Sequence, residues 1–221
     1  PVDIAAESNL VMRAARLLAV HRGATYGAQI ELRKLIPTGG GLGGGSSDAA
    51  TTLIALNQLW GTGLRRGELQ ALGLQLGADV PVFIYGRDAF AEGVGEALQP
   101  LALAPAWYVL VSPGVSIPTA EIFGAKDLTR NTPLLKIADF AASTTRNDLQ
   151  PVACSRYPEV QCVIDWLAQY APARMTGSGS CVFAEFASEQ DAKLVAASCP
   201  QAWTAWKVRS SARHPLFEWL E

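Results

Sequence analysis

The sequence is poor in the residues that usually hold metal ions or build disulfide frameworks, with two histidines and four cysteines among 221 residues. The cysteines show no C-x-x-C spacing, and only His21 and His214 could join them as ligands, so a zinc site is not expected. Scattered cysteines favour the cytoplasm, where thiols stay reduced. The four are Cys154, Cys162, Cys181 and Cys199.

Long hydrophobic runs and an excess of positive charge are also absent. The longest apolar run, Leu101 to Val111, contains Pro105 and is too short to cross a bilayer, and the start shows no charged segment followed by an apolar core. The net charge is −2, and no aromatic residues alternate with Lys and Arg. We therefore expect neither a membrane nor a nucleic acid as partner.

Apolar residues are plentiful, at 49% of the chain, which suffices for the core of one large or two modest domains. Helical spacing predicts helices at residues 9–20, 47–60, 66–76, 119–123, 134–142, 159–170 and 189–197. Alternating or β-rich runs predict strands at residues 28–33, 89–91, 107–111, 181–186 and 202–209. This order of elements indicates an α+β fold.

Glycine is concentrated in one loop, where six of the nine residues from Pro37 to Gly45 are glycine. The loop follows the predicted strand at 28–33 and precedes the predicted helix at 47–60. Glycines let backbone N–H groups approach a ligand, and the first turn of a helix adds unpaired donors at the positive end of its dipole. The pattern therefore predicts a phosphate-binding loop.

Three other interpretations of this loop are less favoured. A flexible Gly/Ser linker would separate domains rather than join two short adjacent elements. A Walker loop needs a lysine before its hydroxyl residue, where Gly45 stands. A serine nucleophile elbow around Ser46 needs a glycine at Asp48, and neither histidine lies in a catalytic motif.

The stretch from Pro37 to Ala50 resembles the second motif of the GHMP kinases, which include galactokinase, homoserine kinase and mevalonate kinase. The stretch from Met175 to Phe183 resembles their third motif. Three further stretches are similar to one branch of that family, the diphosphocytidyl-methylerythritol kinases: Leu76 to Phe83, Ala91 to Gly95 and Pro113 to Thr119.

The resemblance implies the GHMP kinase fold, with a ribosomal-S5-like nucleotide domain followed by a ferredoxin-like C-terminal domain. We expect the first domain at residues 1–92, lacking its first strands, and the second at 93–221. The family's first motif, which carries a lysine, has no counterpart in this chain.

The resemblance also implies ATP and Mg²⁺ as cofactors, with backbone N–H groups of the loop around the phosphates. The hydroxyls of Ser46 and Ser47 would reach a phosphate oxygen or the metal, although either serine could instead be only the N-cap of the following helix. Lys34 would lie against the nucleotide or in solvent, and Asp48 near the adenine. The expected nucleotide-binding residues are Lys34, Pro37, Gly39, Gly40, Gly41, Leu42, Gly43, Gly44, Gly45, Ser46, Ser47 and Asp48, with Ser47 also at the metal.

Asp79 is the candidate catalytic base, because the stretch that contains it matches the family's catalytic-aspartate motif. Its neighbours Ala78, Val80 and Pro81 predict an apolar, poorly solvated bend, in which a carboxylate can act as a base. Taken alone, the same residues are also typical of an ordinary turn aspartate.

The implied second substrate is a cytidine diphosphate-linked polyol, phosphorylated at its C2 hydroxyl on the route to isoprenoid precursors. Phe123 would stack on the cytosine, unless it only anchors its helix in the core, and Val94 would offer backbone hydrogen bonds. Thr119 would offer a hydroxyl to the substrate, and the N–H groups of the turn Gly177, Ser178 and Gly179 would face the transferred phosphate or support the first glycine loop.

Two alternatives remain at this stage. One is another small-molecule GHMP kinase acting on homoserine or mevalonate, and the other is a nucleotide-binding fragment without catalysis. We expect a monomer or a weak dimer.

Overall fold

The computed structural model describes residues 5, 7–22, 27–135, 137 and 145–220. The chain forms two compact units. The first comprises residues 1–35, 43–103 and 211–221, and the second comprises residues 36–42 and 104–210. Because these units interleave along the chain, the predicted division into consecutive domains at residue 92 stays a prediction.

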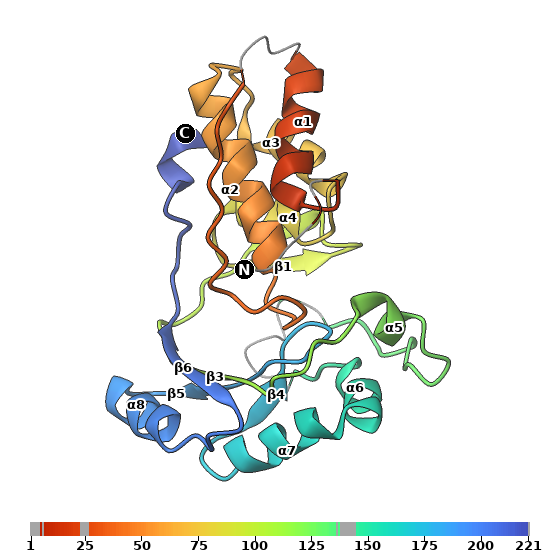
Figure 1. Cartoon of the computed structure of the whole chain (residues 1–221), viewed down its shortest axis with the longest axis vertical. Coiled ribbons are helices and arrows are strands. Elements are labelled where there is room, and N and C mark those ends of the chain that lie inside the picture. Colours follow the sequence, from red (N-terminus) through yellow and green to blue (C-terminus); the bar gives the residue numbers. More distant parts are fainter. Residues whose placement is uncertain (1–4, 6, 23–26, 136, 138–144, 221) are drawn as a thin grey trace. The chain divides into compact units, whose positions relative to one another are not determined.

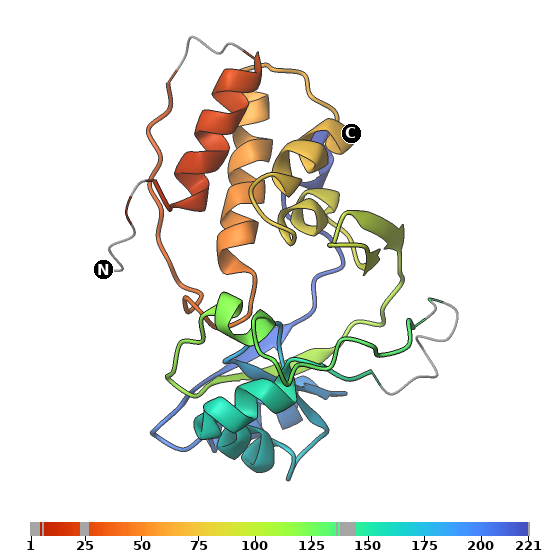
Figure 2. The ribbon, with the colours of Figure 1, turned by 90° about the vertical axis from the view of Figure 1, so that its right-hand side faces the viewer.

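The first unit is built on four helices that share one hydrophobic core. They are α1 (Leu10–Arg22), α2 (Gly44–Leu59), α3 (Arg66–Leu74) and α4 (Val80–Tyr85). Figures 1 and 2 show α1 lying alongside α2, where small side chains allow close packing. The completely buried residues of this contact include Ala14, Leu18, Ala49, Ala50 and Leu53. The predicted helices at 9–20, 47–60 and 66–76 are confirmed, whereas α4 was not expected.

A β-hairpin completes the regular structure of the first unit before residue 103. Strand β1 (Ala89–Glu92) pairs antiparallel with β2 (Ala97–Pro100). Gly93 and Gly95 lie in the connecting turn with φ of 71° and 117°, a region that other residues avoid. The predicted strand at 89–91 is confirmed.

The strand predicted at 28–33 is wrong. Residues 27–35 run without a ladder partner in the part of the chain that the structure describes, and residues 27–33 are exposed. Alternation of apolar and polar residues describes one face of a strand, but the strand itself requires a hydrogen-bonded neighbour. The segment instead lies along α2 as extended chain (Figure 1).

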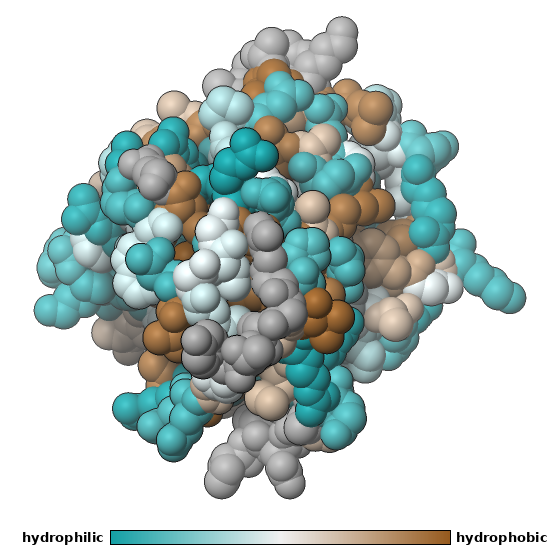
Figure 3. Space-filling model, turned by 90° about the horizontal axis from the view of Figure 1, so that it is seen from above, coloured by the Kyte–Doolittle hydropathy of each residue, from teal (hydrophilic) through white to brown (hydrophobic). Residues whose placement is uncertain are grey.

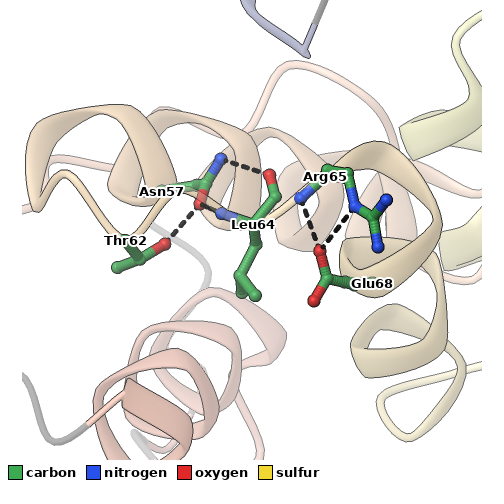
Figure 4. Close-up of polar contacts among 5 residues, drawn as sticks. All are labelled: Asn57, Thr62, Leu64, Arg65 and Glu68. Atoms are coloured by element: carbon green, nitrogen blue, oxygen red, sulfur yellow. Dashed lines mark hydrogen bonds and ion pairs between the residues drawn. The ribbon is translucent and has the colours of Figure 1, made fainter.

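A buried side chain, Asn57, organises the connection from α2 to α3 (Figure 4). Its amide nitrogen donates to the Leu64 carbonyl at 3.0 Å, and its carbonyl oxygen accepts the Leu64 N–H at 3.0 Å. The Thr62 hydroxyl donates to the same oxygen. One asparagine thus satisfies the backbone of a connection that is otherwise without secondary structure.

The C-terminal segment, residues 211–220, returns to the first unit and ends in the 3₁₀ helix η2 (Phe217–Leu220). The His214 backbone N–H donates to the Gly86 carbonyl at 2.9 Å. Its ring Nδ1 accepts the Leu216 N–H at 3.1 Å, so the other nitrogen, Nε2, carries the proton and lies 3.3 Å from the Thr51 hydroxyl. Burial lowers the pKa of His214 below its ordinary value of 6.5.

The second unit contains a four-stranded antiparallel sheet. Its strands are β3 (Trp107–Ser112), β4 (Ala173–Met175), β5 (Val182–Phe186) and β6 (Thr204–Arg209), and their spatial order is β4-β5-β3-β6. With helices after β3 and between β5 and β6, this is the βαββαβ order of a ferredoxin-like domain. The predicted ferredoxin-like fold is confirmed for this unit.

The helices of this unit among its described residues include α5 (Thr119–Phe123), α6 (Gln150–Arg156), α7 (Pro158–Leu167) and α8 (Glu189–Ala197). Helices α7 and α8 pack on the sheet and share its core, which includes Val109, Val111, Val163, Val182 and Ala192. The predicted helices at 119–123, 159–170 and 189–197 are confirmed, as are the strands at 107–111, 181–186 and 202–209. The helix predicted at 134–142 falls mostly outside the described residues.

Apolar and polar side chains alternate over the face of the molecule in Figure 3, without a single continuous apolar surface. Among the described residues, no helix is long and apolar enough to cross a membrane.

Replacing Asn57 by alanine leaves the Leu64 N–H and carbonyl without their partner. Because an unsatisfied buried backbone group costs about 1–3 kcal/mol, we expect the free energy of unfolding to fall by about that amount or more. Urea denaturation measures this, with Gln58→Ala, at an exposed neighbour on α2, as the control. Equal stabilities of the two variants would contradict the role of Asn57.

The lowered pKa of His214 predicts a pH-dependent stability. The folded chain keeps the imidazole neutral, whereas the unfolded chain binds a proton below about pH 6.5. The free energy of unfolding should therefore fall as the pH decreases below 6.5. Denaturation between pH 7.5 and 5.5 should show a smaller decrease for His214→Gln than for the exposed-site control His21→Gln. The same slope in both variants would show that His214 does not cause it.

Candidate functional site

The glycine loop alternates between two backbone conformations. Gly39, Gly41 and Gly43 have φ of 70°, 69° and 64°, whereas Gly40 and Leu42 between them do not have positive φ. Alternation of this kind turns successive amides toward one side and forms a concave anion-binding nest. The path of the backbone therefore requires positive φ, and hence glycine, at every second residue from Gly39 to Gly43.

The carbonyl groups of this loop face a second glycine turn, Gly177 to Gly179 with its flanking residues, in the same unit. The Gly39 carbonyl accepts the N–H groups of Ile117 at 3.3 Å and of Ser180 at 3.2 Å. The Gly40 carbonyl accepts the N–H of Cys181 at 3.1 Å. The Gly41 carbonyl accepts the Thr176 hydroxyl at 3.0 Å. Three consecutive carbonyls are thus held by the second unit.

This arrangement leaves three amides directed away from the turn. A trans peptide places its N–H opposite its carbonyl, so the amides of Gly40, Gly41 and Leu42 point outward. In the described part of the chain, none of these three amides donates a hydrogen bond. The loop therefore presents a row of free backbone donors, which is suited to phosphate oxygens.

The contact with the second turn leaves no room for side chains. A Cβ atom at Gly41 would lie 2.2 Å from the Thr176 carbonyl oxygen and 2.8 Å from the Gly179 nitrogen. A Cβ atom at Gly40 would lie 2.9 Å from the Cys181 sulfur. Burial raises the pKa of the Cys181 thiol, so this side chain stays protonated and serves packing.

The second turn itself, Gly177 to Gly179, holds the predicted substrate residues of this unit together. Ser178 is buried, and its hydroxyl lies 2.8 Å from the Thr119 hydroxyl on α5. Ile122 anchors α5 in the core, whereas Phe123 is 51% exposed. The alternative that Phe123 anchors the helix is therefore wrong, and its ring is open to stacking.

Helix α2 begins at Gly44, directly after the loop, and its N-cap is Gly43 without a side-chain hydrogen bond. The alternative that Ser46 or Ser47 is the N-cap is therefore wrong. Both serines lie in the first turn, at the positive end of the helix dipole; the Ser47 N–H donates to the Gly43 carbonyl at 2.8 Å, whereas the N–H groups that precede it in the helix have no acceptor within the helix. A bound anion is the natural partner for these amides.

Lys34 and Asp48 form an ion pair in the first unit, with side chains that are 16% and 28% exposed. Lys34 is therefore not a solvent-exposed flanking residue. Asp48 also lines a cavity of about 260 Å³ between α2 and the extended segment. Its other walls are mainly apolar and include Val11, Ile30, Leu32 and Ala55. The cavity has the size and walls for a planar ring.

Asp79 lies at the start of α4, as its N-cap, but its carboxylate makes no cap hydrogen bond. The side chain is exposed, so the predicted poorly solvated bend is wrong: only Val80 and Pro81 turn into the core. Among the described residues Asp79 has no hydrogen-bond or ion-pair partner. A Cβ atom at Gly77 would lie 4.0 Å from the Ser46 hydroxyl oxygen, so this turn adjoins the start of α2.

The hairpin turn of the first unit packs against the residue before Asp79. A Cβ atom at Gly95 would lie 2.6 Å from the Ala78 carbonyl oxygen. Val94, at the tip, is 68% exposed, and its N–H donates to the Glu96 carboxylate at 2.8 Å. The first unit thus brings Ser46, Asp79 and Val94 into one region, with the Val94 amide occupied by Glu96.

No group of three or more His, Cys, Asp or Glu side chains that could hold a metal ion occurs within the described ranges. Sequence reasoning missed Asn147 and Thr176, which support the second turn. Asn147 stands two residues before the N-cap of α6, a position typical of a local turn, but its long-range contacts carry no signal in the spacing.

Comparisons with known proteins agree with this geometry. Residues 9–87 match the GHMP kinases N terminal domain, and residues 126–205 match the GHMP kinases C terminal domain. The 4-diphosphocytidyl-2-C-methyl-D-erythritol kinases of Aromatoleum aromaticum and Azoarcus sp. are each 67% identical to this chain, over 98% and 99% of its length and 76% and 77% of theirs. A solved structure of 4-(cytidine 5'-diphospho)-2C-methyl-D-erythritol kinase matches with a TM-score of 0.79 at 36% identity, over 91% of this chain and 77% of that one.

Substituting Gly41 by alanine should displace the loop, because φ near +70° alone costs about 1–2 kcal/mol and the new Cβ collides with the Thr176 carbonyl. We expect the affinity for a non-hydrolysable ATP analogue to fall at least about tenfold, as measured by calorimetry.

The matched control is Gly63→Ala, since Gly63 has φ of 67° and no atom within 4 Å of its added Cβ. This variant carries the same backbone strain away from the loop. If Gly41→Ala binds the analogue as tightly as Gly63→Ala does, the outward amides are not the phosphate site.

Proposed function

Because this chain belongs to the GHMP kinase family, we propose that it transfers the terminal phosphoryl group of ATP to the C2 hydroxyl of 4-diphosphocytidyl-2-C-methyl-D-erythritol. The names of the two relatives that are 67% identical support this substrate over homoserine or mevalonate. The single observation that carries the proposal is the row of outward amides at Gly40, Gly41 and Leu42.

In this proposal the nucleotide phosphates lie against backbone donors. The amides of the nest and of the first turn of α2 point at the phosphate oxygens, and the helix dipole favours their negative charge. Pro37 and the glycines up to Gly45 supply the path of the loop, and the Ser46 and Ser47 hydroxyls add donors at its end. Backbone groups of this kind are preorganised and need no rearrangement when charge moves during transfer.

The cavity beside the Lys34–Asp48 pair supports a site for the adenine ring. Its apolar walls would cover the faces of the ring, while Thr51, Thr52 and Asp48 offer polar atoms for its edge. The ion pair keeps the Asp48 carboxylate in place, because both partners are largely buried.

We propose Mg²⁺ as the second cofactor. The chemistry of the available donors fits this ion, because Ser47 supplies a hydroxyl oxygen, and Mg²⁺ commonly takes its other ligands from phosphate oxygens and water. When bound, it would neutralise charge on the phosphates during transfer. The contribution of this chain is the position of Ser47 in the first turn of α2.

Asp79 is proposed as the base. Its exposed, unpartnered carboxylate would accept the proton of the attacking hydroxyl, whose oxygen bonds to the γ-phosphorus as the bond to ADP breaks. Val94 would contact the cytosine with its backbone, after its amide leaves Glu96, and Thr119 with Gly177, Ser178 and Gly179 would line the substrate site. Stacking on Phe123 would contribute about 1–3 kcal/mol.

Nucleotide binding without efficient transfer is the second candidate function. Within the described residues the Asp79 carboxylate makes no cap hydrogen bond and no ion pair that would orient it. The absence of one electrostatic contact at a reacting group commonly reduces a rate by about 10²–10³. The structure supports the binding part of both candidates equally.

Single-turnover transfer of the γ-phosphoryl group tests the proposal. For Asp79→Asn we expect a rate about 10²–10⁴ lower with nucleotide affinity unchanged, because the amide cannot accept the proton. The control is Asp165→Asn, at an exposed aspartate of α7. Transfer by Asp79→Asn at the original rate would exclude Asp79 as the base, and nucleotide binding without transfer by the unchanged chain would favour the second candidate.

A further inference from the structure

Asn147 uses its side-chain amide in three hydrogen bonds. The Nδ2 group donates to the Met175 carbonyl at 3.0 Å and to the Gly177 carbonyl at 2.8 Å, and Oδ1 accepts the Leu149 N–H at 2.9 Å. This pattern fixes the orientation of the amide, since a flipped group would place its oxygen against two carbonyl oxygens.

The two carbonyls that Asn147 holds lie on either side of Thr176. Thr176 is the residue whose hydroxyl donates to the Gly41 carbonyl at 3.0 Å, and its own backbone bonds Cys181 and Gly179 at 2.9 Å each. The backbone N–H of Met175 is held as well, by the Gln150 side-chain oxygen at 2.9 Å. The segment 147–150 therefore fixes the backbone on which the glycine loop rests.

The role of Asn147 differs from that of a helix cap. A cap or local turn before α6 would need only the bond from Oδ1 to Leu149, and it would leave Nδ2 in solvent. Here both Nδ2 donors reach across 28 and 30 residues to the second turn. With these donors occupied, Asn147 has none left for a ligand and acts through the turn.

We infer that Asn147 is a positioning residue for phosphate binding. Its side chain fixes the position of the Thr176 backbone, and the Thr176 hydroxyl donates to the Gly41 carbonyl. The position of this carbonyl then fixes the outward direction of the neighbouring amides. This inference rests on the proposed function, in which those amides bind the phosphates of ATP. It goes further by assigning nucleotide affinity to a side chain that does not touch the nucleotide.

The test variant is Asn147→Asp, which keeps the shape and the acceptor for Leu149 but loses both donors. We expect the dissociation constant for a non-hydrolysable ATP analogue to rise about 10- to 100-fold, because misplaced groups lose affinity steeply. Adenosine affinity should change less than about twofold, because adenosine has no phosphate for the loop. A purely structural role would not separate the two ligands in this way.

Two further variants keep the test decisive. Asn147→Ser, whose single short hydroxyl cannot donate to both carbonyls and which adds no charge, should show the same separation between ATP analogue and adenosine if Asn147→Asp does not fold. Val163→Ala, a cavity variant in the core of the second unit, is the stability control and should leave both affinities unchanged.

A double-mutant cycle with Thr176→Val, which lacks the hydroxyl for Gly41, completes the test. If Asn147 acts through Thr176, the double variant should lose clearly less affinity for the ATP analogue than the product of the two single losses.

The outcomes separate this inference from the proposed function. No binding of the ATP analogue by the unchanged chain would overturn both. An unchanged chain that binds, with Asn147→Asp binding equally well or losing adenosine affinity in parallel, would overturn the positioning role alone. A full multiplicative loss in the double variant would also overturn it, because the two residues would then act independently.

Discussion

The structure depends on the close approach of two backbone segments, Gly39 to Gly41 and Thr176 to Cys181. Three hydrogen bonds join them, and the separations leave no room for Cβ atoms at Gly40 or Gly41. A single constraint therefore has two effects. It anchors a glycine-rich chain that would otherwise cost much conformational entropy to order, and it turns the amides outward.

The candidate site relies on backbone groups where many nucleotide sites rely on charged side chains. Charged residues make up only 17% of the sequence, and Lys34, the lysine nearest the loop in sequence, is already paired with Asp48. Amides and a helix dipole hold phosphate without a counter-charge that must be desolvated. The Asp79 carboxylate likewise forms no ion pair in the described part of the chain.

Sequence reasoning succeeded where the information is local. Glycine density located a loop that needs positive φ at Gly39, Gly41 and Gly43, and helical spacing located α1, α3 and α8 to within a few residues. It failed where a distant partner decides the outcome, as for the strand at 28–33, which lacks a neighbour to pair with among the described residues. The solvation of Asp79 and the contacts of Asn147 were missed for the same reason, since spacing does not encode contacts across the fold.

The start of α2 has a consequence for how this chain trades stability against activity. Gly43 is the N-cap, and its φ of 64° and the Phe83 ring, 3.0 Å from where its Cβ atom would lie, keep serine or aspartate out of this position, so no side chain caps the first-turn amides. In the proposed function a ligand phosphate takes that place instead, which would couple occupancy to folding through mass action. Selection for thermal stability alone would therefore have to rebuild the loop before it could add a capping side chain, and that side chain would compete with the substrate for the same donors.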